Sequence, residues 1–275
     1  MNITKKLAIL VVPIALLIQA CGSPEPAQLP QARQFDPTRS DARAIAWADN
    51  VMQAVGAGDA FGQIRYIRFH FVLREKDTVR VDRAHWWNRQ TDDYKIEWFD
   101  PMGNQYTVLL NLRTGQGEAW FNRKPVADSL QSQTLLQRAY ASVINDTYWL
   151  LMPFKLKDPG VILSYEGETE IDGQIRIVIG LAFDNVGLTP QNRYRIYIDP
   201  ETHLVRRWDF FKTPDAEPRP ALWLDWQEWH GVKIALQRKF LQKPITITFE
   251  QVRLDTVVDA SAFLPPASPP DMTEK

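Results

Sequence analysis

Apolar and polar residues alternate with a period of two over most of the chain. In the first such run, Phe69 and Phe71 fall on one side and His70 on the other. Successive side chains of a β-strand point to opposite faces, so this alternation predicts strands with one apolar face. The predicted strands are residues 67–73, 79–88, 94–99, 105–112, 117–121, 161–168, 175–183, 193–198, 204–211, 222–229, 232–241 and 245–254. Because short turns join most of them, we expect a mainly β fold in which one antiparallel sheet of about 11–12 strands curls.

Two segments show the three- and four-residue spacing of a helix instead. The first covers residues 41–55, and the second covers residues 130–144. An apolar stretch follows the second helix, and it contains Leu150, Leu151, Met152 and Phe154. The sequence therefore predicts an N-terminal helix and an inserted helix, with these four residues as a plug or lid.

The first twenty residues have the pattern of a secretory signal peptide. Lys5 and Lys6 precede a twelve-residue apolar run that only Pro13 interrupts, and this run is too short to span a bilayer. The segment ends Ile18-Gln19-Ala20-Cys21, which resembles a bacterial lipobox. That resemblance implies cleavage before Cys21 and lipidation of its thiol. The alternative is an ordinary secretory signal that happens to contain a cysteine.

The rest of the chain divides into three parts. Residues 21–40 hold the lipidated cysteine and a proline-rich flexible tether, residues 41–266 form a single domain, and residues 267–275 are a disordered tail. Two or more acyl chains on one residue anchor a protein stably to a membrane. Gly22 and Ser23 follow the cysteine in place of an aspartate resembling an inner-membrane retention signal, so we expect the periplasmic side of the outer membrane.

Composition narrows the class of protein. The 275 residues carry 32 basic and 33 acidic side chains, and loss of Lys5 and Lys6 with the signal leaves 30 against 33, a net charge of −3. This balance argues against a nucleic-acid partner. The single cysteine excludes an intramolecular disulfide, and we expect a monomer.

No motif predicts catalysis, a metal or a cofactor. The four histidines, at positions 70, 85, 203 and 230, lack the spacing of metal ligands, and each is expected at a strand surface or a turn. Nucleophile elbows and phosphate-binding glycine loops are likewise missing from the sequence. We therefore expect a protein that is not an enzyme.

The apolar halves of the strands are either an ordinary core or the wall of a cavity. Aromatic residues and methionine would suit a pocket that adapts to varied acyl chains. The candidate wall residues are Phe69, Phe71, Tyr94, Ile96, Trp98, Ile177, Ile179, Leu181, Phe183, Tyr194, Ile196, Trp208 and Phe210. A register slip of one residue would turn any of these strands inside out.

Three segments resemble the LolA/LolB superfamily of lipoprotein carriers and receptors. They are Trp86-Trp87-Asn88-Arg89 leading to Tyr94-Lys95-Ile96-Glu97-Trp98, the hairpin at residues 110–121, and the closing stretch from Asp259 to Pro266. The resemblance implies an unclosed antiparallel β-barrel with helices packed into its mouth around an apolar cavity. The stretch at residues 148–160 has no counterpart in the family pattern.

From this resemblance we expect an outer-membrane lipoprotein that binds a lipid, an acyl chain or a lipidated protein and takes part in lipoprotein or lipid transport. Two alternatives stay open. The first is an envelope interaction module whose barrel is filled by side chains, and the second is a hydrolase of envelope glycans or lipids. A buried pair of carboxylates with raised pKa would favour the hydrolase.

Replacing the lipidation residue tests the predicted anchor. Cys21→Ala removes the thiol that would carry the acyl chains, so the protein should move from the membrane fraction to the soluble periplasmic fraction. Fractionation followed by immunoblotting measures this. An unchanged membrane fraction would contradict the anchor, and Ser23→Ala serves as the matched control.

Overall fold

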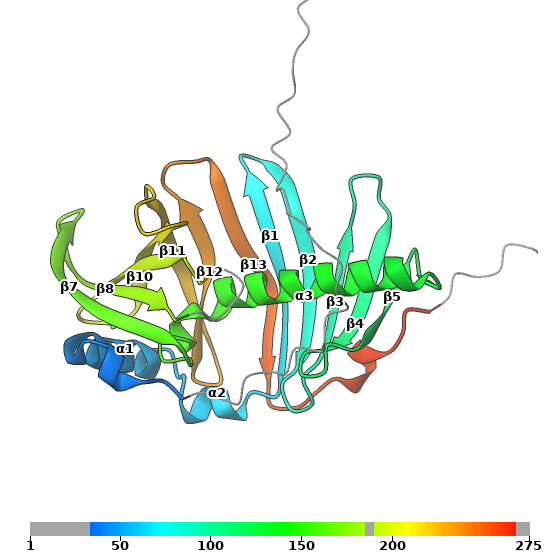
Figure 1. Cartoon of the computed structure of the whole chain (residues 1–275), viewed down its shortest axis with the longest axis horizontal. Helices are drawn as coiled ribbons and strands as arrows, with labels where there is room; N and C mark the ends of the chain where they lie inside the picture. Colours follow the sequence, from blue (N-terminus) through cyan, green and yellow to red (C-terminus); the bar gives the residue numbers. More distant parts are fainter. Residues whose placement is uncertain (1–33, 185–189, 268–275) are drawn as a thin grey trace, which may run out of the picture. The chain divides into compact units, whose positions relative to one another are not determined.

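A computed structural model describes residues 34–184 and 190–267, and these residues form one curved antiparallel sheet with helices on its inner side (Figure 1). The strands are β1 (Tyr66–Glu75), β2 (Thr78–Asn88), β3 (Asp93–Phe99), β4 (Gln105–Asn111), β5 (Gly117–Phe121), β6 (Lys124–Pro125), β7 (Val161–Ile171), β8 (Gln174–Phe183), β9 (Arg193–Ile198), β10 (Val205–Phe211), β11 (Arg219–Trp229), β12 (Val232–Phe240) and β13 (Ile245–Asp255). The helices are η1 (Pro37–Arg39), α1 (Ala42–Ala54), α2 (Asp59–Gln63), α3 (Ser129–Leu151), η2 (Met152–Phe154) and η3 (Ala260–Phe263).

The sheet is open and has β6 and β7 at its two edges. Its strand order is β6-β5-β4-β3-β2-β1-β13-β12-β11-β10-β9-β8-β7. Each half is a meander, and the halves join where β1 pairs with β13, from Tyr66 opposite Asp255 to Glu75 opposite Ile245. The chain leaves the first half of the sheet at one edge, after β6, and must enter the second half at the opposite edge, at β7. The segment between β6 and β7 therefore has to cross the whole sheet.

Helix α3 makes this crossing on the concave side (Figure 1). Thirteen strands about 4.8 Å apart follow an arc of roughly 58 Å, whereas a helix of 23 residues is only about 35 Å long. The helix alone is therefore shorter than the arc, and the residues on either side of it complete the connection between the two edges. Asp128 begins the helix by accepting a hydrogen bond from the backbone N–H of Gln131 at 2.7 Å.

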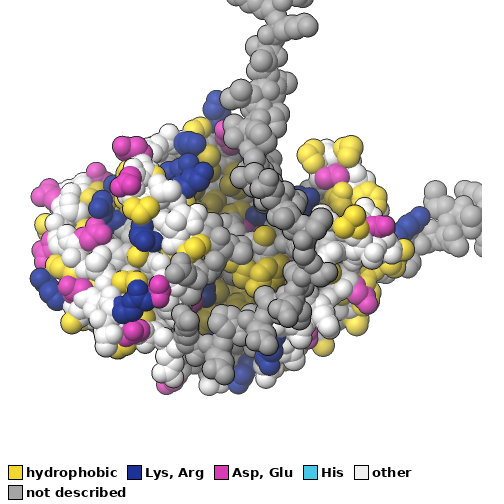
Figure 2. Space-filling view, in the orientation of Figure 1, with side chains coloured by type: hydrophobic (Ala, Val, Ile, Leu, Met, Phe, Trp, Pro, Cys, Tyr) yellow, Lys and Arg dark blue, Asp and Glu magenta, His cyan; other side chains and the backbone are white. Residues whose placement is uncertain are grey.

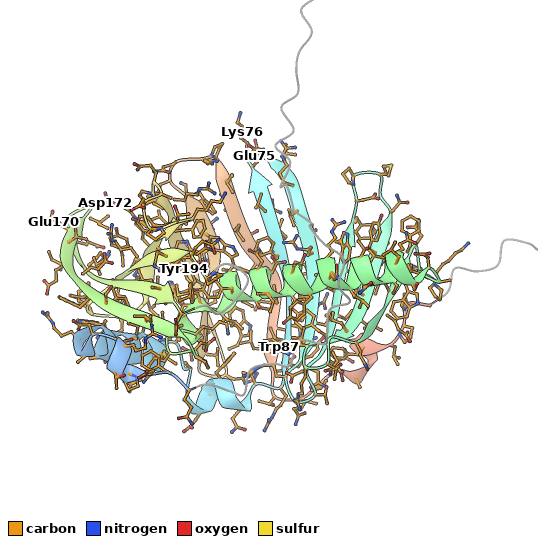
Figure 3. All side chains as sticks on the ribbon, in the orientation of Figure 1. Glu75, Lys76, Trp87, Glu170, Asp172 and Tyr194 are labelled. Carbon is orange, nitrogen blue, oxygen red and sulfur yellow. The ribbon has the colours of Figure 1, made fainter. Side chains whose placement is uncertain are left out.

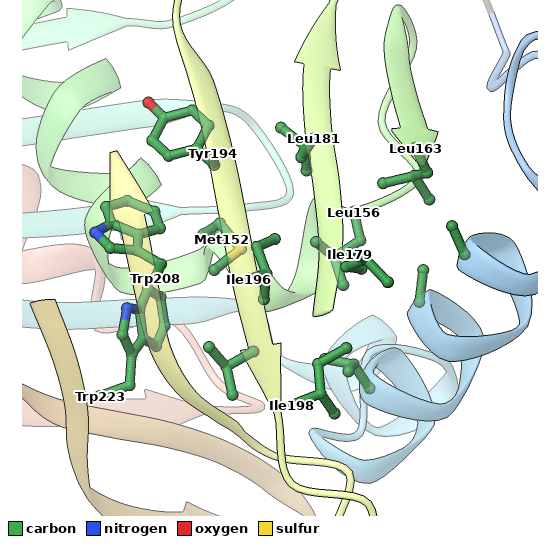
Figure 4. Packing of buried hydrophobic residues seen from close by; sticks show 14 of the residues in the cluster. Met152, Leu156, Leu163, Ile179, Leu181, Tyr194, Ile196, Ile198, Trp208 and Trp223 are labelled. Carbon is green, nitrogen blue, oxygen red and sulfur yellow. The ribbon is translucent and has the colours of Figure 1, made fainter. Parts of the chain in front are cut away.

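Three groups of buried apolar side chains line the concave side. Near β3–β5 the wall packs against Leu135, Ala139 and Val143 of α3. At the centre, strands β1, β12 and β13 pack against Leu150 and Leu151. In the other half, strands β7–β11 pack against η2 and α1, as the close view in Figure 4 shows.

All twelve strands predicted from the alternation are present, so the mainly β, unclosed sheet with a central helix is confirmed. The additional strand is β6, which has only two residues and contains a proline. The inserted helix is longer than predicted because it continues from residue 144 through the first lid residues. Helix α2 was not expected, since five residues are too few to show a helical period.

The folded region begins before residue 41, inside the segment expected to be a tether. Phe35 packs against the hydrophobic core, and the Ser40 hydroxyl accepts a hydrogen bond from the Leu163 backbone N–H at 3.0 Å. The Asp41 backbone N–H in turn donates to the Leu163 carbonyl at 2.9 Å. These two bonds cover part of the exposed edge of β7. The predicted signal peptide, Cys21, most of the tether and the tail from residue 268 lie outside the described residues.

A substitution at Gly56, at the end of α1, tests how closely this helix end approaches the sheet. The φ of Gly56 is +75°, and a β-carbon there would lie 2.1 Å from the Gly231 carbonyl oxygen in the β11–β12 turn. Gly56→Ala should therefore lower the free energy of unfolding by about 2 kcal/mol or more. Denaturant unfolding measures this loss.

Gly62→Ala is the matched control, because a β-carbon at that position meets no atom within 4 Å. Alanine favours a helix over glycine, so this change should leave stability equal or raise it by up to about 1 kcal/mol. Equal effects of the two substitutions would contradict the close approach at Gly56.

Candidate functional site

The predicted wall residues lie on the concave side of the sheet. All of them are buried except Phe183 and Phe210, which are half-buried. Figure 3 shows Trp87 and Tyr194 within the two halves of the molecule, whereas charged residues such as Glu75 and Asp172 stand at hairpin tips. On the five strands that carry these residues, β1, β3, β8, β9 and β10, they form a buried or half-buried side.

Half-buried side chains join the three groups into one continuous apolar surface. Trp149 and Trp226 pack against both the central group and the β7–β11 group. Trp87 likewise packs against both the central group and the β3–β5 group. Figure 2 shows hydrophobic side chains gathered along the middle of this face, between the two halves. We call this concave surface, with its wall residues and these linking side chains, the inner face.

The lid residues do not enclose a space but fill it. Leu150, Leu151, Met152 and Phe154 are all buried against the inner face. Beside them, the ring of Trp149 lies with its centroid 4.3 Å from that of Trp208, and Tyr148 lies 5.7 Å from Tyr194. A surface pocket of about 400 Å³ lies elsewhere, at the turn between α1 and α2. Access to the inner face therefore requires α3 to move.

A buried polar network ties the last third of α3, at Asp146, to β2 and β3. The Asp146 carboxylate accepts two hydrogen bonds from the Arg83 guanidinium, at 2.6 and 2.7 Å. It also lies 3.0 Å from Nε2 of His85, whose Nδ1 is 3.0 Å from the Tyr94 hydroxyl. The side chains of His85 and Asp146 are fully buried. The ring of His85 stacks on Phe69 with centroids 4.4 Å apart.

The chemistry of these groups fixes their protonation. A carboxylate only accepts hydrogen bonds, so Nε2 of His85 carries the proton and Nδ1 accepts from Tyr94. Burial lowers the pKa of His85 more than Asp146 raises it, so the ring stays neutral. Although burial opposes it, the hydrogen bonds from His85 and Arg83 and the charge of Arg83 hold the pKa of Asp146 below its usual value. Burial and the Asp146 charge raise the pKa of Tyr94 well above its usual value.

A second tie holds the end of α3. The Arg238 guanidinium on β12 donates a 2.8 Å hydrogen bond to the carbonyl of Trp149, in the last turn of the helix. A cation near the carboxyl end of a helix is stabilised by the helix dipole. Arg238 is completely buried, and burial lowers its pKa well below its usual value.

Sequence reasoning missed most of this polar site. Arg83, Asp146 and Arg238 were not candidates, and the expectation that His85 lies at a surface or turn is wrong. His203 and His230 do lie at turns, where both have positive φ. The available signal was the position of Asp146 three residues after Val143 and four before Leu150, on the apolar stripe of α3. A carboxylate on such a stripe needs a buried partner.

The described residues offer little for the chemistry of an enzyme. Their two buried carboxylates, Asp146 and Asp209, are each paired with an arginine, Arg83 and Arg207 respectively. A general acid in a hydrolase needs a carboxyl with a raised pKa, which is the opposite of the shift at Asp146. Three or more potential metal ligands nowhere converge within the described ranges. None of the helices there is long and apolar enough to cross a membrane.

Comparison with known proteins places the chain among folds of this kind. Residues 117–221 match a family of unknown function (DUF6503). No curated protein sequence matches the chain.

Solved structures with a similar arrangement include a DUF1329 family protein from Desulfovibrio piger, at 13% identity over 80% of this chain and 97% of that one, with a TM-score of 0.46. A LolA superfamily protein from Nitrosomonas europaea is 9% identical over 79% of this chain and 97% of that one, with a TM-score of 0.46. A Vibrio parahaemolyticus domain named for outer membrane lipoprotein sorting is 9% identical over 80% and 97%, with a TM-score of 0.43.

The network around Asp146 predicts a loss of stability in acid. Because the pKa of His85 is lower in the folded protein, the unfolded chain takes up a proton first as the pH falls below about 6.5. The free energy of unfolding should then fall by up to about 1.4 kcal/mol per pH unit until the folded value is reached. Asp146 adds a second loss below about pH 3.9, because its carboxylate must then be protonated.

Denaturant unfolding of His85→Gln and of the unchanged protein between pH 7.5 and 5 measures the first loss. The glutamine variant should be less stable at pH 7.5 and should lack the His85 part of the acid-induced loss. His70→Gln, on the opposite face of β1 from Phe69, is the matched control. If His85 instead stabilised the protein more as the pH fell, the neutral assignment would be wrong.

Proposed function

We propose that this chain is a lipid-anchored monomer of the periplasmic side of the outer membrane that binds a lipid, an acyl chain or a lipidated protein on its inner face. It is not an enzyme in this proposal, and its role lies in lipid or lipoprotein transport. Cys21 supplies the anchor and α3 acts as the lid. The observation that carries the proposal is the continuous apolar inner face, covered along much of its length by one helix.

The energetics of burial suit this role. Each methylene buried from water contributes about 0.8 kcal/mol, so a long acyl chain can bind by burial alone, without any reaction at the ligand. The ligand would take over the contacts that Leu150, Leu151 and Trp149 now make with the inner face. When the ligand replaces the side chains of α3, the inner face stays covered by apolar groups. The free-energy cost of moving α3 is therefore small compared with the cost of exposing the inner face to water.

The two polar ties would set how readily the lid opens. A buried ion pair such as Arg83–Asp146 contributes little net stability, because desolvation offsets its attraction, but it specifies one geometry strictly. The tie holds α3 in register over the sheet when no ligand is present. The apolar contacts elsewhere along α3 allow the helix to shift along the sheet. The arginine–carboxylate pair, with its two hydrogen bonds, allows only one position.

The filled inner face also favours a second candidate, an envelope interaction module. In that case the helix would never leave the sheet, and a partner would contact exposed apolar residues such as Phe99 and Met102 on the β3–β4 hairpin. The two candidates differ in whether lipid reaches the inner face.

Two measurements on the soluble Cys21→Ala protein test the leading proposal. Solvent extraction and mass spectrometry should recover a non-covalently bound lipid. A fluorescent acyl probe should bind to the protein, and the tryptophan side chains should become less accessible to solvent when it binds. Absence of both, with one partner protein captured by crosslinking, would instead favour the interaction module.

Removing the Arg83–Asp146 tie should speed ligand exchange. In the double variant Arg83→Met and Asp146→Leu, apolar side chains of similar size replace the ion pair. The buried Nε2–H of His85 then loses its acceptor, which lowers the free energy of unfolding by about 1–3 kcal/mol, and α3 loses its polar register. We expect the acyl probe to exchange about tenfold faster than in the parent, as measured by stopped-flow fluorescence.

The matched control removes the exposed pair Arg80–Glu75 at the β1–β2 hairpin with two glutamines, and it should leave exchange unchanged. Equal exchange rates in all three proteins would show that α3 does not gate the inner face.

A further inference from the structure

Five buried hydrogen-bond donors on the inner face have no acceptor within the part of the chain that the structure describes. Two are the indole N–H groups of Trp87 and Trp98, at the β3–β5 group, and the other three are the indole N–H groups of Trp208 and Trp223 and the Nε–H of Arg238. All three side chains are almost completely buried. Buried donors are nearly always satisfied in folded proteins, so such a cluster requires an explanation.

Arg238 is unusual because its charge is buried without an opposite charge. Its two terminal nitrogens donate to the carbonyls of Ala235, Gln237 and Trp149, at 2.9, 3.2 and 2.8 Å. No carboxylate in the described ranges forms an ion pair with it. The guanidinium lies instead 3.4 Å from the ring centroid of Trp223. A cation held only by neutral groups in a dry site attracts an anion strongly.

The three side chains that carry these donors lie next to one another. The rings of Trp208 and Trp223 are 5.3 Å apart, and Arg238 covers the second of them. Figure 4 shows both indole nitrogens on the same side of the two rings, pointing away from Ile196 and Ile198. Trp226 provides the contrast, because its indole N–H donates to the Val205 carbonyl at 3.2 Å. The neighbouring tryptophan is thus satisfied by the fold itself.

Capping of α3 accounts for only part of this arrangement. The bond from Arg238 to the Trp149 carbonyl uses one terminal nitrogen, and it leaves Nε and both indoles unused. A purely structural core would place apolar side chains at these positions, since an unsatisfied buried donor is costly. The cluster instead combines one positive charge with several donors and no free acceptor.

We propose that Trp208, Trp223 and Arg238 form the headgroup subsite of the inner face, and that it selects amphiphiles with an anionic oxygen headgroup, a carboxylate or a phosphate. This inference rests on the proposed function, because the subsite lies beneath Tyr148 and Trp149 and is reached only when α3 moves. An anionic oxygen accepts several hydrogen bonds at once and neutralises Arg238. Neutral heads lack the charge, and cationic heads are repelled.

A series of sixteen-carbon amphiphiles tests the subsite, with the soluble full-length Cys21→Ala protein as the parent. Palmitate and hexadecyl phosphate should bind at least about tenfold more tightly than hexadecanol, and hexadecyltrimethylammonium should bind more weakly still. Displacement of the fluorescent acyl probe, below the critical micelle concentration of each compound, measures the affinities.

Three variants assign the preference to the named donors. Arg238→Met should abolish the preference for an anionic head while leaving hexadecanol binding within about twofold. The double variant Trp208→Phe and Trp223→Phe removes only the indole donors and should reduce the preference several-fold. Trp86→Phe is the matched control, because this indole lies on the opposite face of β2 from His85, beneath Arg68 and Lys95, and its loss should change nothing. Should Arg238→Met fail to fold, as judged by circular dichroism, the tryptophan pair decides the question.

The outcomes separate the two proposals. Equal binding of palmitate and hexadecanol would overturn the headgroup subsite and leave the proposed function intact. Failure of every amphiphile to bind would overturn both. Acetate and inorganic phosphate, tested alone, distinguish a lipid headgroup from a free anion. Binding of either as tight as that of palmitate and dependent on Arg238 would assign the cluster to a free anion instead.

Discussion

The connection between β6 and β7 is the constraint on which the rest of the structure depends. The sheet is open, and the chain leaves it at one edge and returns at the other, so one segment must span the concave side. An α-helix is the natural solution, because it satisfies its own backbone hydrogen bonds while crossing strands that cannot pair with it. Its apolar stripe then has to match the apolar faces of many strands at once. The position of α3 and the burial of the inner face are consequences of this one crossing.

A helix held by apolar contacts alone could slide or rotate, and the polar residues beneath α3 prevent this. Asp146 meets Arg83 and His85 in the last third of the helix, and Arg238 meets the Trp149 carbonyl one turn further on, in the last turn. Each tie buries a charge, which costs solvation, and each is therefore weak as a source of stability and strong as a source of position. The two ties differ in whether the buried charge has an opposite charge beside it. The Asp146 charge is matched by that of Arg83, whereas the Arg238 charge is matched by nothing in the described residues.

That difference connects the fold to the proposed function. A polar network in which every charge and donor is paired, such as that of Asp146, suits a hinge or a register point of the helix that always keeps the same partners. An unmatched cation beside unused indole donors suits a position where a ligand supplies the missing acceptor. The inner face would then have an apolar part that binds acyl chains generally and a polar part that orients them. Orientation matters for a carrier, because a lipid must be delivered with its headgroup facing the correct way.

The sequence by itself determined the strands, the N-terminal helix and most of α3, because these depend on the periods of two and 3.6 residues. Phe69, Ile96, Ile179 and Trp208, which the alternation put on the apolar side of their strands, are buried in the structure. Only the tertiary structure decided that β13 lies beside β1 and that α3 fills the concave side. It also brought Asp146 to Arg83, 63 residues away, and Trp149 to Arg238, 89 residues away. Such pairings depend on the order of strands and the path of the crossing helix, which leave no trace in a local period. For that reason the sequence could identify the wall of the site, and only the fold could show what covers it.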